Sequence, residues 1–281
     1  MGALEHPLRV VTRVAWLAWE LILIAVLYIF RVAFRRDQPF IEARAHWLHQ
    51  GCRHVLRVFN AEVRSTGKVP KTGLLVSNHL GYLDILALSS LTPSVFVAKR
   101  DVRHWPVFGW FARLGGTLFA DRERRLQVGE LTKELRSALD SGALVILFPE
   151  GTSSDGQTVL PFKSSLLEPA TGCCHALTAS LIAYRLEDGD VGEEVCYWKD
   201  MTFVPHLINL LSKKRVEVSV QFSELRKGST NRKELARQLH AEVLKLKQLH
   251  YRSALDNDQL ACHQAGSRGP ETHLRPQNHA S

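Results

Sequence analysis

The chain has 281 residues, of which 45% are hydrophobic and 23% are charged, with a formal net charge of +8. This length and composition suit one sizeable domain with a buried core and short appendages. The positive charge favours acidic partners such as anionic lipid headgroups, nucleic acid or phosphorylated substrates. No nucleic-acid-binding module is recognisable, and the basic residues are spread out rather than interleaved with aromatic ones, which favours an anionic membrane.

An apolar run near the N-terminus, residues 14–30, is interrupted only by Glu20. With residues 32–34 added it reaches the length of about 20 residues that a membrane-spanning helix needs. The alternative is a helix embedded in one leaflet, with Glu20 near the polar side. The charged residues 31–37 that follow argue against a signal peptide. The run is flanked by Arg9 and Arg13 before it and by Arg31, Arg35 and Arg36 after it, which favours a catalytic domain that faces the cytoplasm.

Residues 40–60 carry apolar side chains at near-helical spacing among basic ones. This pattern predicts a second amphipathic helix, which docks on the core or on the membrane surface. We therefore expect residues 1–60 to form a membrane-anchoring helical segment.

From residue 62 onward, strand-like and helix-like segments alternate. Strands are predicted at residues 74–77, 94–99, 115–119, 143–148, 177–184 and 216–222, and helices at residues 84–91, around 128–138 and at 231–249. The alternation predicts an α/β fold, a mixed sheet with helices on both faces, over residues 61–252. The polar residues 253–281 are predicted to be a disordered tail.

His79 follows the first predicted strand, and Asp84 comes five residues later. Histidine exchanges a proton readily near neutral pH, and a carboxylate on one ring nitrogen leaves the other free to accept a proton. The pair therefore has the composition of a general base and its orienting group.

A second polar segment, residues 150–153, follows the buried strand at 143–148. Gly151, Thr152 and Ser153 supply backbone amides and hydroxyls that can cradle a phosphate, and Gly151 permits a close backbone approach. Glu150 would repel a phosphate, so we expect it to orient basic residues or to bind acceptor hydroxyls.

Six blocks in a fixed order resemble the glycerolipid acyltransferases, in particular the 1-acylglycerol-3-phosphate (lysophosphatidate) acyltransferase family. The blocks are residues 78–84, 97–101, 105–109, 116–122, 148–153 and 161–163. The resemblance covers about residues 70–185. One feature departs from the family pattern, because the strand at residues 179–184 lacks a proline, which puts the shape of the acceptor pocket in question.

The resemblance implies which residues form the site. His79 and Asp84 match the catalytic residues, and the acceptor hydroxyl attacks a thioester directly without a covalent acyl-enzyme. Arg122 matches the residue that binds the acceptor phosphate. The remaining residues expected to bind substrate are Asn78, Lys99, Glu150, Gly151, Thr152, Ser153 and Lys163.

The sequence thus predicts a membrane-attached acyltransferase of phospholipid biosynthesis. It would convert 1-acylglycerol-3-phosphate to phosphatidate, with acyl-CoA or acyl carrier protein as co-substrate. No metal or nucleotide motif is present, and no cofactor is expected. The five cysteines are odd in number and lack metal-ligand spacing, which predicts reduced thiols.

Two alternatives remain. The acceptor could be another lysolipid, such as lyso-ornithine lipid, or the chain could be a non-catalytic lipid-binding protein on the same fold. Intact His79 and Asp84 argue against loss of catalysis. A thioesterase or other hydrolase would need a nucleophile elbow, and the sequence has no Gly-x-Ser-x-Gly at a strand-to-helix turn.

Overall fold

The computed structural model describes residues 6–34, 40–105, 107–120, 125–172, 175–225 and 228–266. Residues 1–246 form one compact unit and residues 247–281 form a second. The first unit contains the sheet and the candidate site.

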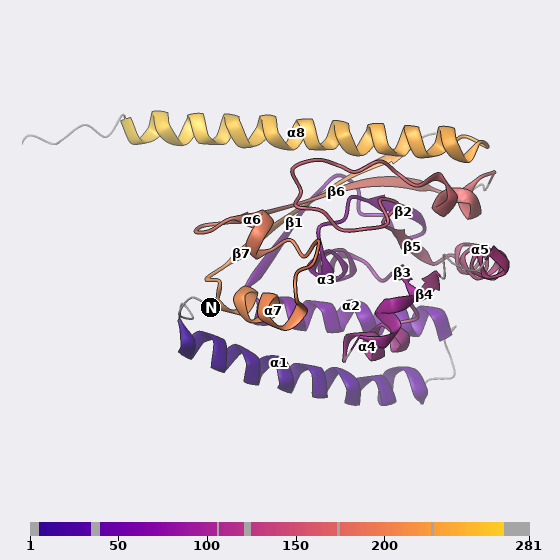
Figure 1. Cartoon of the computed structure of the whole chain (residues 1–281), viewed down its shortest axis with the longest axis horizontal. Helices are drawn as coiled ribbons and strands as arrows, with labels where there is room; N and C mark the ends of the chain where they lie inside the picture. The colour runs from indigo at the N-terminus through magenta and orange to yellow at the C-terminus, as the bar shows by residue number, and fades with distance from the viewer. Residues whose placement is uncertain are drawn as a thin grey trace, which may run out of the picture. The chain divides into compact units, whose positions relative to one another are not determined.

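The centre of the first unit is a mixed sheet of seven strands among the described residues, in the order β1-β7-β6-β2-β5-β3-β4 (Figure 1). The strands are β1 (Ala61–Thr66), β2 (Gly73–Ser77), β3 (Val95–Lys99), β4 (Leu118–Ala120), β5 (Leu144–Leu147), β6 (Leu177–Leu186) and β7 (Val216–Leu225). Only β6 and β7 pair antiparallel, and the other neighbours are parallel. The predicted α/β fold with a mixed sheet is confirmed.

The α-helices are α1 (Pro7–Tyr28), α2 (Phe40–Val58), α3 (Tyr82–Leu91), α4 (Phe108–Leu114), α5 (Arg125–Asp140), α6 (Val191–Glu194), α7 (Phe203–Ser212) and α8 (Arg232–Gly266). The helices predicted at the N-terminal apolar run and at residues 40–60 are present as α1 and α2, and those predicted at residues 84–91 and around 128–138 are present as α3 and α5. The short helices α4 and α7 and the edge strand β1 were not predicted. With seven residues, α4 shows too few turns for a helical period to be visible, and Pro205 in the first turn of α7 obscured that helix.

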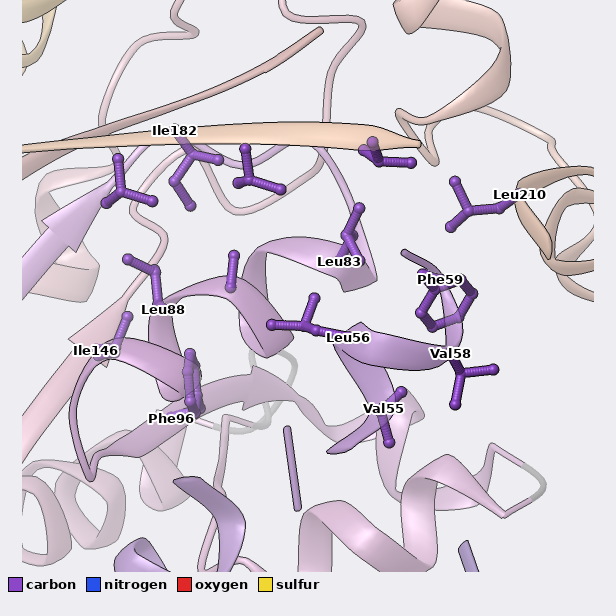
Figure 2. Packing of buried hydrophobic residues seen from close by; sticks show 14 of the residues in the cluster. Val55, Leu56, Val58, Phe59, Leu83, Leu88, Phe96, Ile146, Ile182 and Leu210 are labelled. Carbon is purple, nitrogen blue, oxygen red and sulfur yellow. The ribbon is translucent and has the colours of Figure 1, made fainter. Parts of the chain in front are cut away.

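Side chains alternate along the central strands and so build two cores, one on each face of the sheet. In β2, Leu75 belongs to the first core, whereas Leu74 and Val76 belong to the second. Figure 2 shows part of the first core, where α2, α3, α7 and β6 contribute Leu56, Leu83, Leu88, Leu210 and Ile182 among others. The second core is covered by α5 and by the first part of α8. Helices therefore lie on both faces, as predicted.

The N-terminal helix lies along α2 and continues past Tyr28 as a π-helical turn, Ile29–Ala33. The indole Nε1 of Trp47 in α2 donates to the carbonyl of Ile24 over 2.8 Å. Gly51 allows this approach, because a Cβ there would lie 3.0 Å from the Ile24 side chain. The segment Pro7–Ala33 is long and apolar enough to cross a membrane by length and composition.

Glu20 lies on the side of α1 that faces the protein. Its carboxylate accepts hydrogen bonds from Trp16 Nε1 at 3.0 Å and pairs with His54 Nδ1 at 2.9 Å. The single acidic residue of the apolar run is therefore turned toward α2, and the opposite side of α1 exposes apolar side chains.

The last helix, α8, begins where it was predicted and ends later. Asn231 Oδ1 accepts from the backbone amides of Lys233 at 2.9 Å and Glu234 at 3.4 Å, as an N-cap does. The helix was expected to end near Leu249 and continues to Gly266. The disordered tail predicted for residues 253–281 is therefore wrong for residues 253–266, which continue the helix. Residues 267–281 lie outside the described residues, so there the tail stays a prediction.

Candidate active site

The candidate site forms where β2 ends and α3 begins. His79 lies in the connecting loop, and Asp84 is the third residue of α3. The Asp84 carboxylate caps the helix, because its Oδ2 accepts from the backbone amides of Leu80 at 2.6 Å and Gly81 at 3.0 Å. Asp84 is completely buried, and these bonds fix its carboxylate relative to the loop that carries His79.

His79 and Asp84 contact each other as a base and its orienting carboxylate. Nδ1 of His79 lies 2.7 Å from Asp84 Oδ2, which assigns the Nδ1 proton and leaves Nε2 as the acceptor. The ring stacks on Phe148, with centroids 4.2 Å apart and an interplanar angle of 19°. The side chain of His79 is 22% exposed and lines the cavity described below. The geometry is that of a general base.

Tyr184, in β6, is a site residue that the sequence did not reveal. Its hydroxyl donates to the second carboxylate oxygen of Asp84, Oδ1, over 2.5 Å. Burial, followed by the charge of Asp84, raises the pKa of Tyr184 well above its ordinary value. The two residues are a hundred positions apart in sequence, so only the pairing of β6 beside β2 brings them together.

Backbone bonds hold the neighbouring loops against the His79 loop. The amide of Ser154 donates to the carbonyl of His79 at 3.0 Å, and the amide of Tyr197 donates to that of Leu80 at 2.8 Å. Gly81 is required for this packing, because a Cβ there would lie 2.9 Å from the Tyr197 nitrogen. Gly151 has φ +70°, a conformation that favours glycine, in the loop that follows β5.

A cavity of about 280 Å³ opens beside His79. Its walls come from α2, α3, β3, α4, the end of β5 and the loop at residues 151–153, and most of its side chains are apolar. They include Leu48, Ile85, Phe96, Val102, Phe108, Phe111, Ala112, Leu147, Phe148 and Leu166. An apolar cavity that ends at a proton acceptor suits a long hydrocarbon chain whose reactive end lies at His79.

Four of the predicted substrate-binding residues line this cavity, namely Lys99, Gly151, Thr152 and Ser153. Lys99 is the last residue of β3 and is exposed. Ser153 Oγ donates to the carbonyl of Tyr197 at 2.6 Å, which orders the loop at the cavity wall.

The other predicted substrate-binding residues lie elsewhere or are not described. The side-chain amide of Asn78 is bonded to the backbone of Ile182 through both its oxygen and its nitrogen, at 2.8 and 3.0 Å. Asn78 therefore ties the end of β2 to β6. Glu150 is buried and Lys163 is exposed, and neither lines the cavity. Arg122 lies outside the described residues.

No group of three or more potential metal ligands occurs among the residues described by the structure. Cys52 lines the cavity, and burial raises the pKa of its thiol to about 12. A thiol in that state is not a nucleophile near neutral pH. His79 is therefore the candidate proton acceptor of this cavity.

Comparisons with known proteins agree with this geometry. The Acyltransferase family model matches residues 60–184. The chain is 34% identical over 217 residues to a lyso-ornithine lipid O-acyltransferase of Rhizobium meliloti, covering 72% of this chain and 73% of the relative. A protein of the same name from Brucella abortus is 37% identical, with 70% and 79% covered. A 1-acyl-sn-glycerol-3-phosphate acyltransferase of Neisseria gonorrhoeae is 31% identical, with 54% and 60% covered.

The fold has a solved counterpart. The crystal structure of the 1-acyl-sn-glycerophosphate acyltransferase of Thermotoga maritima matches with a TM-score of 0.59 at 22% identity, covering 85% of this chain and 98% of that one. The chain belongs to the acyltransferase family and is an enzyme of the lysophospholipid acyltransferase class. The family resemblance and the enzyme class predicted from the sequence are confirmed.

Proposed function

We propose that this enzyme transfers a fatty acyl group from a thioester directly to the free hydroxyl of a lysolipid, without a covalent acyl-enzyme. His79 Nε2 removes the proton of the acceptor hydroxyl as its oxygen attacks the thioester carbonyl, and Asp84 stabilises the imidazolium that forms. The thiol of the donor leaves when the tetrahedral intermediate collapses and takes up the proton held by His79. The observation that carries the proposal is the 2.7 Å contact between His79 and Asp84 at an apolar cavity.

Two acceptors are supported by different observations. We rank lyso-ornithine lipid first, because the two relatives described above with that name cover 70–72% of this chain at 34–37% identity. The 1-acyl-sn-glycerol-3-phosphate acyltransferase of Neisseria gonorrhoeae covers 54% of this chain at 31% identity. The ordered sequence blocks, with Lys99 and Arg122 as expected phosphate ligands, favour 1-acylglycerol-3-phosphate and the product phosphatidate as the second candidate.

The donor proposed is acyl-CoA or acyl carrier protein, and the chemistry needs no metal or other cofactor. The basic surface of the chain suits either acidic donor. The same charge suits a catalytic domain on the cytoplasmic side of the membrane.

We propose that α1 lies in the plane of one leaflet. Arg13, near the start of α1, donates to the carbonyls of Leu211 at 3.0 Å and Lys213 at 2.5 Å, at the end of α7. Farther along, the Ile24 carbonyl binds Trp47 of α2. A helix attached to the domain at two points along its length lies beside the domain rather than leaving it to cross a bilayer. Apolar residues on its outer side, such as Trp19 and Ile22, and Phe30 in the π-helical turn that continues it are exposed and would enter the lipid.

The experiment is an acceptor panel. Purified protein is incubated with labelled acyl-CoA or acyl carrier protein and with lyso-ornithine lipid, 1-acylglycerol-3-phosphate or a neutral lysolipid. We expect labelled product with lyso-ornithine lipid at the highest kcat/KM. Preference for 1-acylglycerol-3-phosphate would favour the second candidate, and failure to acylate any lysolipid with either donor would refute the proposed function.

A further inference from the structure

The Asp84 carboxylate has different donors on its two oxygens. Oδ2 accepts from His79 Nδ1 and from two backbone amides of the same loop. Oδ1 accepts from the hydroxyl of Tyr184, which reaches it from β6. Tyr184 packs against the first core and is absent from the cavity lining, so it touches no substrate and acts on catalysis only through Asp84.

We propose that Tyr184 is a positioning residue, whose hydroxyl holds the Asp84 carboxylate in the orientation that keeps the proton on His79 Nδ1 and leaves Nε2 as the base. This inference rests on the proposed function, in which Nε2 accepts the proton of the acceptor hydroxyl.

The hydrogen bond from Tyr184 to Asp84 is important because Asp84 is buried. Asp84 is completely buried, so water cannot replace a lost donor on Oδ1, and a charged acceptor left without a donor is costly. Among the described residues, Tyr184 is the side chain that bonds Oδ1. Without it, the carboxylate is held only through Oδ2, by Leu80, Gly81 and His79. It can then turn about those bonds, and its orientation toward His79 Nδ1 is less tightly fixed.

Tyr184 remains a donor over the working pH range, because burial and Asp84 both raise its pKa. The other titratable groups that act on it are Cys196 and Tyr82, and burial raises the pKa of both. They stay neutral near pH 7, so no nearby group removes the Tyr184 proton as the enzyme turns over.

The test compares Tyr184→Phe with a matched variant, Thr92→Val. Thr92 is also buried and donates one hydrogen bond, to the carbonyl of Pro70 at 3.0 Å, and it lies outside the cavity lining. We expect Tyr184→Phe to lower kcat about tenfold with little change in either KM. Thr92→Val should lose stability with kcat unchanged.

Nitrogen-15 NMR of the His79 imidazole ring tests the same inference without turnover, and comparison with His79→Ala assigns the ring signals. We expect the Nδ1-protonated form of His79 in the wild type and a mixture of tautomers in Tyr184→Phe. Wild-type kcat and an unchanged tautomer in a folded Tyr184→Phe would overturn the inference. A wild type that transfers no acyl group would instead refute the proposed function, while the NMR result still decides the role of Tyr184.

Discussion

The two polar parts of the site are built differently. At the base, His79 and Asp84 are held by backbone amides and by Tyr184 from a central strand. At the expected headgroup end, Lys99 is exposed at the last residue of β3, and Arg122 follows the short strand β4 in sequence. The base is therefore preorganised by the core, whereas Lys99, the described side chain expected to bind the headgroup, is exposed at a strand end.

This difference suggests that chemistry and acceptor choice are separable. A rigid base can serve any lysolipid hydroxyl placed beside it, and the residues that bind the headgroup can differ without disturbing the sheet. It also offers a reason why relatives that share this fold carry names for different acceptors. Changes at the base should therefore act on kcat, and changes at the headgroup end on the acceptor KM.

The largest effect is expected from His79→Ala. Loss of the proton acceptor should reduce kcat by at least about 10² with the fold retained, because base catalysis is typically worth that much. His175→Ala is the matched control, since His175 also pairs with an aspartate, Asp140 at 2.9 Å, and lies outside the cavity lining. A folded His79→Ala that kept more than about a tenth of wild-type turnover would show that His79 is not the base.

Arg122→Ala should act on the other end of the site. Removal of a charged bidentate contact costs about 1.5–3 kcal/mol, so the KM for 1-acylglycerol-3-phosphate should rise by one to two decades with the donor KM little changed. The exposed Lys133→Ala in α5 serves as the charge control. Equal rises in both KM values would point to a structural ion pair and would remove the proposed separation between base and headgroup.

A smaller effect is expected from charges placed on the outer side of α1. Ile22→Lys or Phe30→Lys should lower binding to vesicles several-fold and reduce activity on bilayer lipid, because a lysine costs about 2.5–3.5 kcal/mol at the bilayer centre and less at the interface. Activity on a soluble short-chain acceptor should be spared. Leu244→Lys in α8 is the control. Release of the wild type by high salt alone would show that attachment is mainly ionic.

Point changes test the membrane role of α1 better than its removal. Val10, Leu17 and Ile24 are buried within the unit, so deletion of residues 1–36 would uncover apolar surface on α2 and destabilise the domain.

The smallest effect concerns stability at low pH. Burial lowers the pKa of His206 from its ordinary value of 6.5, and its ring accepts from Tyr82 and donates to the Cys196 carbonyl. His206 therefore binds a proton more readily in the unfolded chain than in the folded one. The contribution of neutral His206 to the free energy of unfolding is complete above pH 6.5 and is lost as the pH falls below that value.

Urea unfolding at about pH 7.5 and about pH 5.5 measures the change. His206→Gln should reduce the loss of stability on acidification. Part of the loss should remain, because burial also lowers the pKa of His49. An identical pH dependence in His206→Gln and the wild type would show that His206 does not contribute.

Much of this fold could be predicted because its elements repeat clear patterns. Two strands, β2 and β5, are continuous apolar runs, and β7 alternates apolar and polar side chains. These patterns were sufficient to predict a mixed sheet. The end of α8 was predicted too early, because the residues after Leu249 are polar. No proline or glycine stops the helix before Gly266.

The site was predicted where it is local in sequence and missed where it is not. His79 and Asp84 lie in one loop and its helix, so their spacing was visible. Tyr184 depends on which strands are neighbours, and Asn78 turned out to bond the backbone of Ile182. A single sequence does not contain the strand order that decides both contacts.

The most direct test of the central claim is a single-turnover experiment with labelled acyl thioester and no acceptor. Direct attack from a hydroxyl activated by His79 predicts no burst of free thiol and no acyl group on the protein, followed by product and thiol together once lysolipid is added. His79→Ala should remain silent in both stages. A stoichiometric burst of thiol with a covalently acylated wild-type protein would contradict the account.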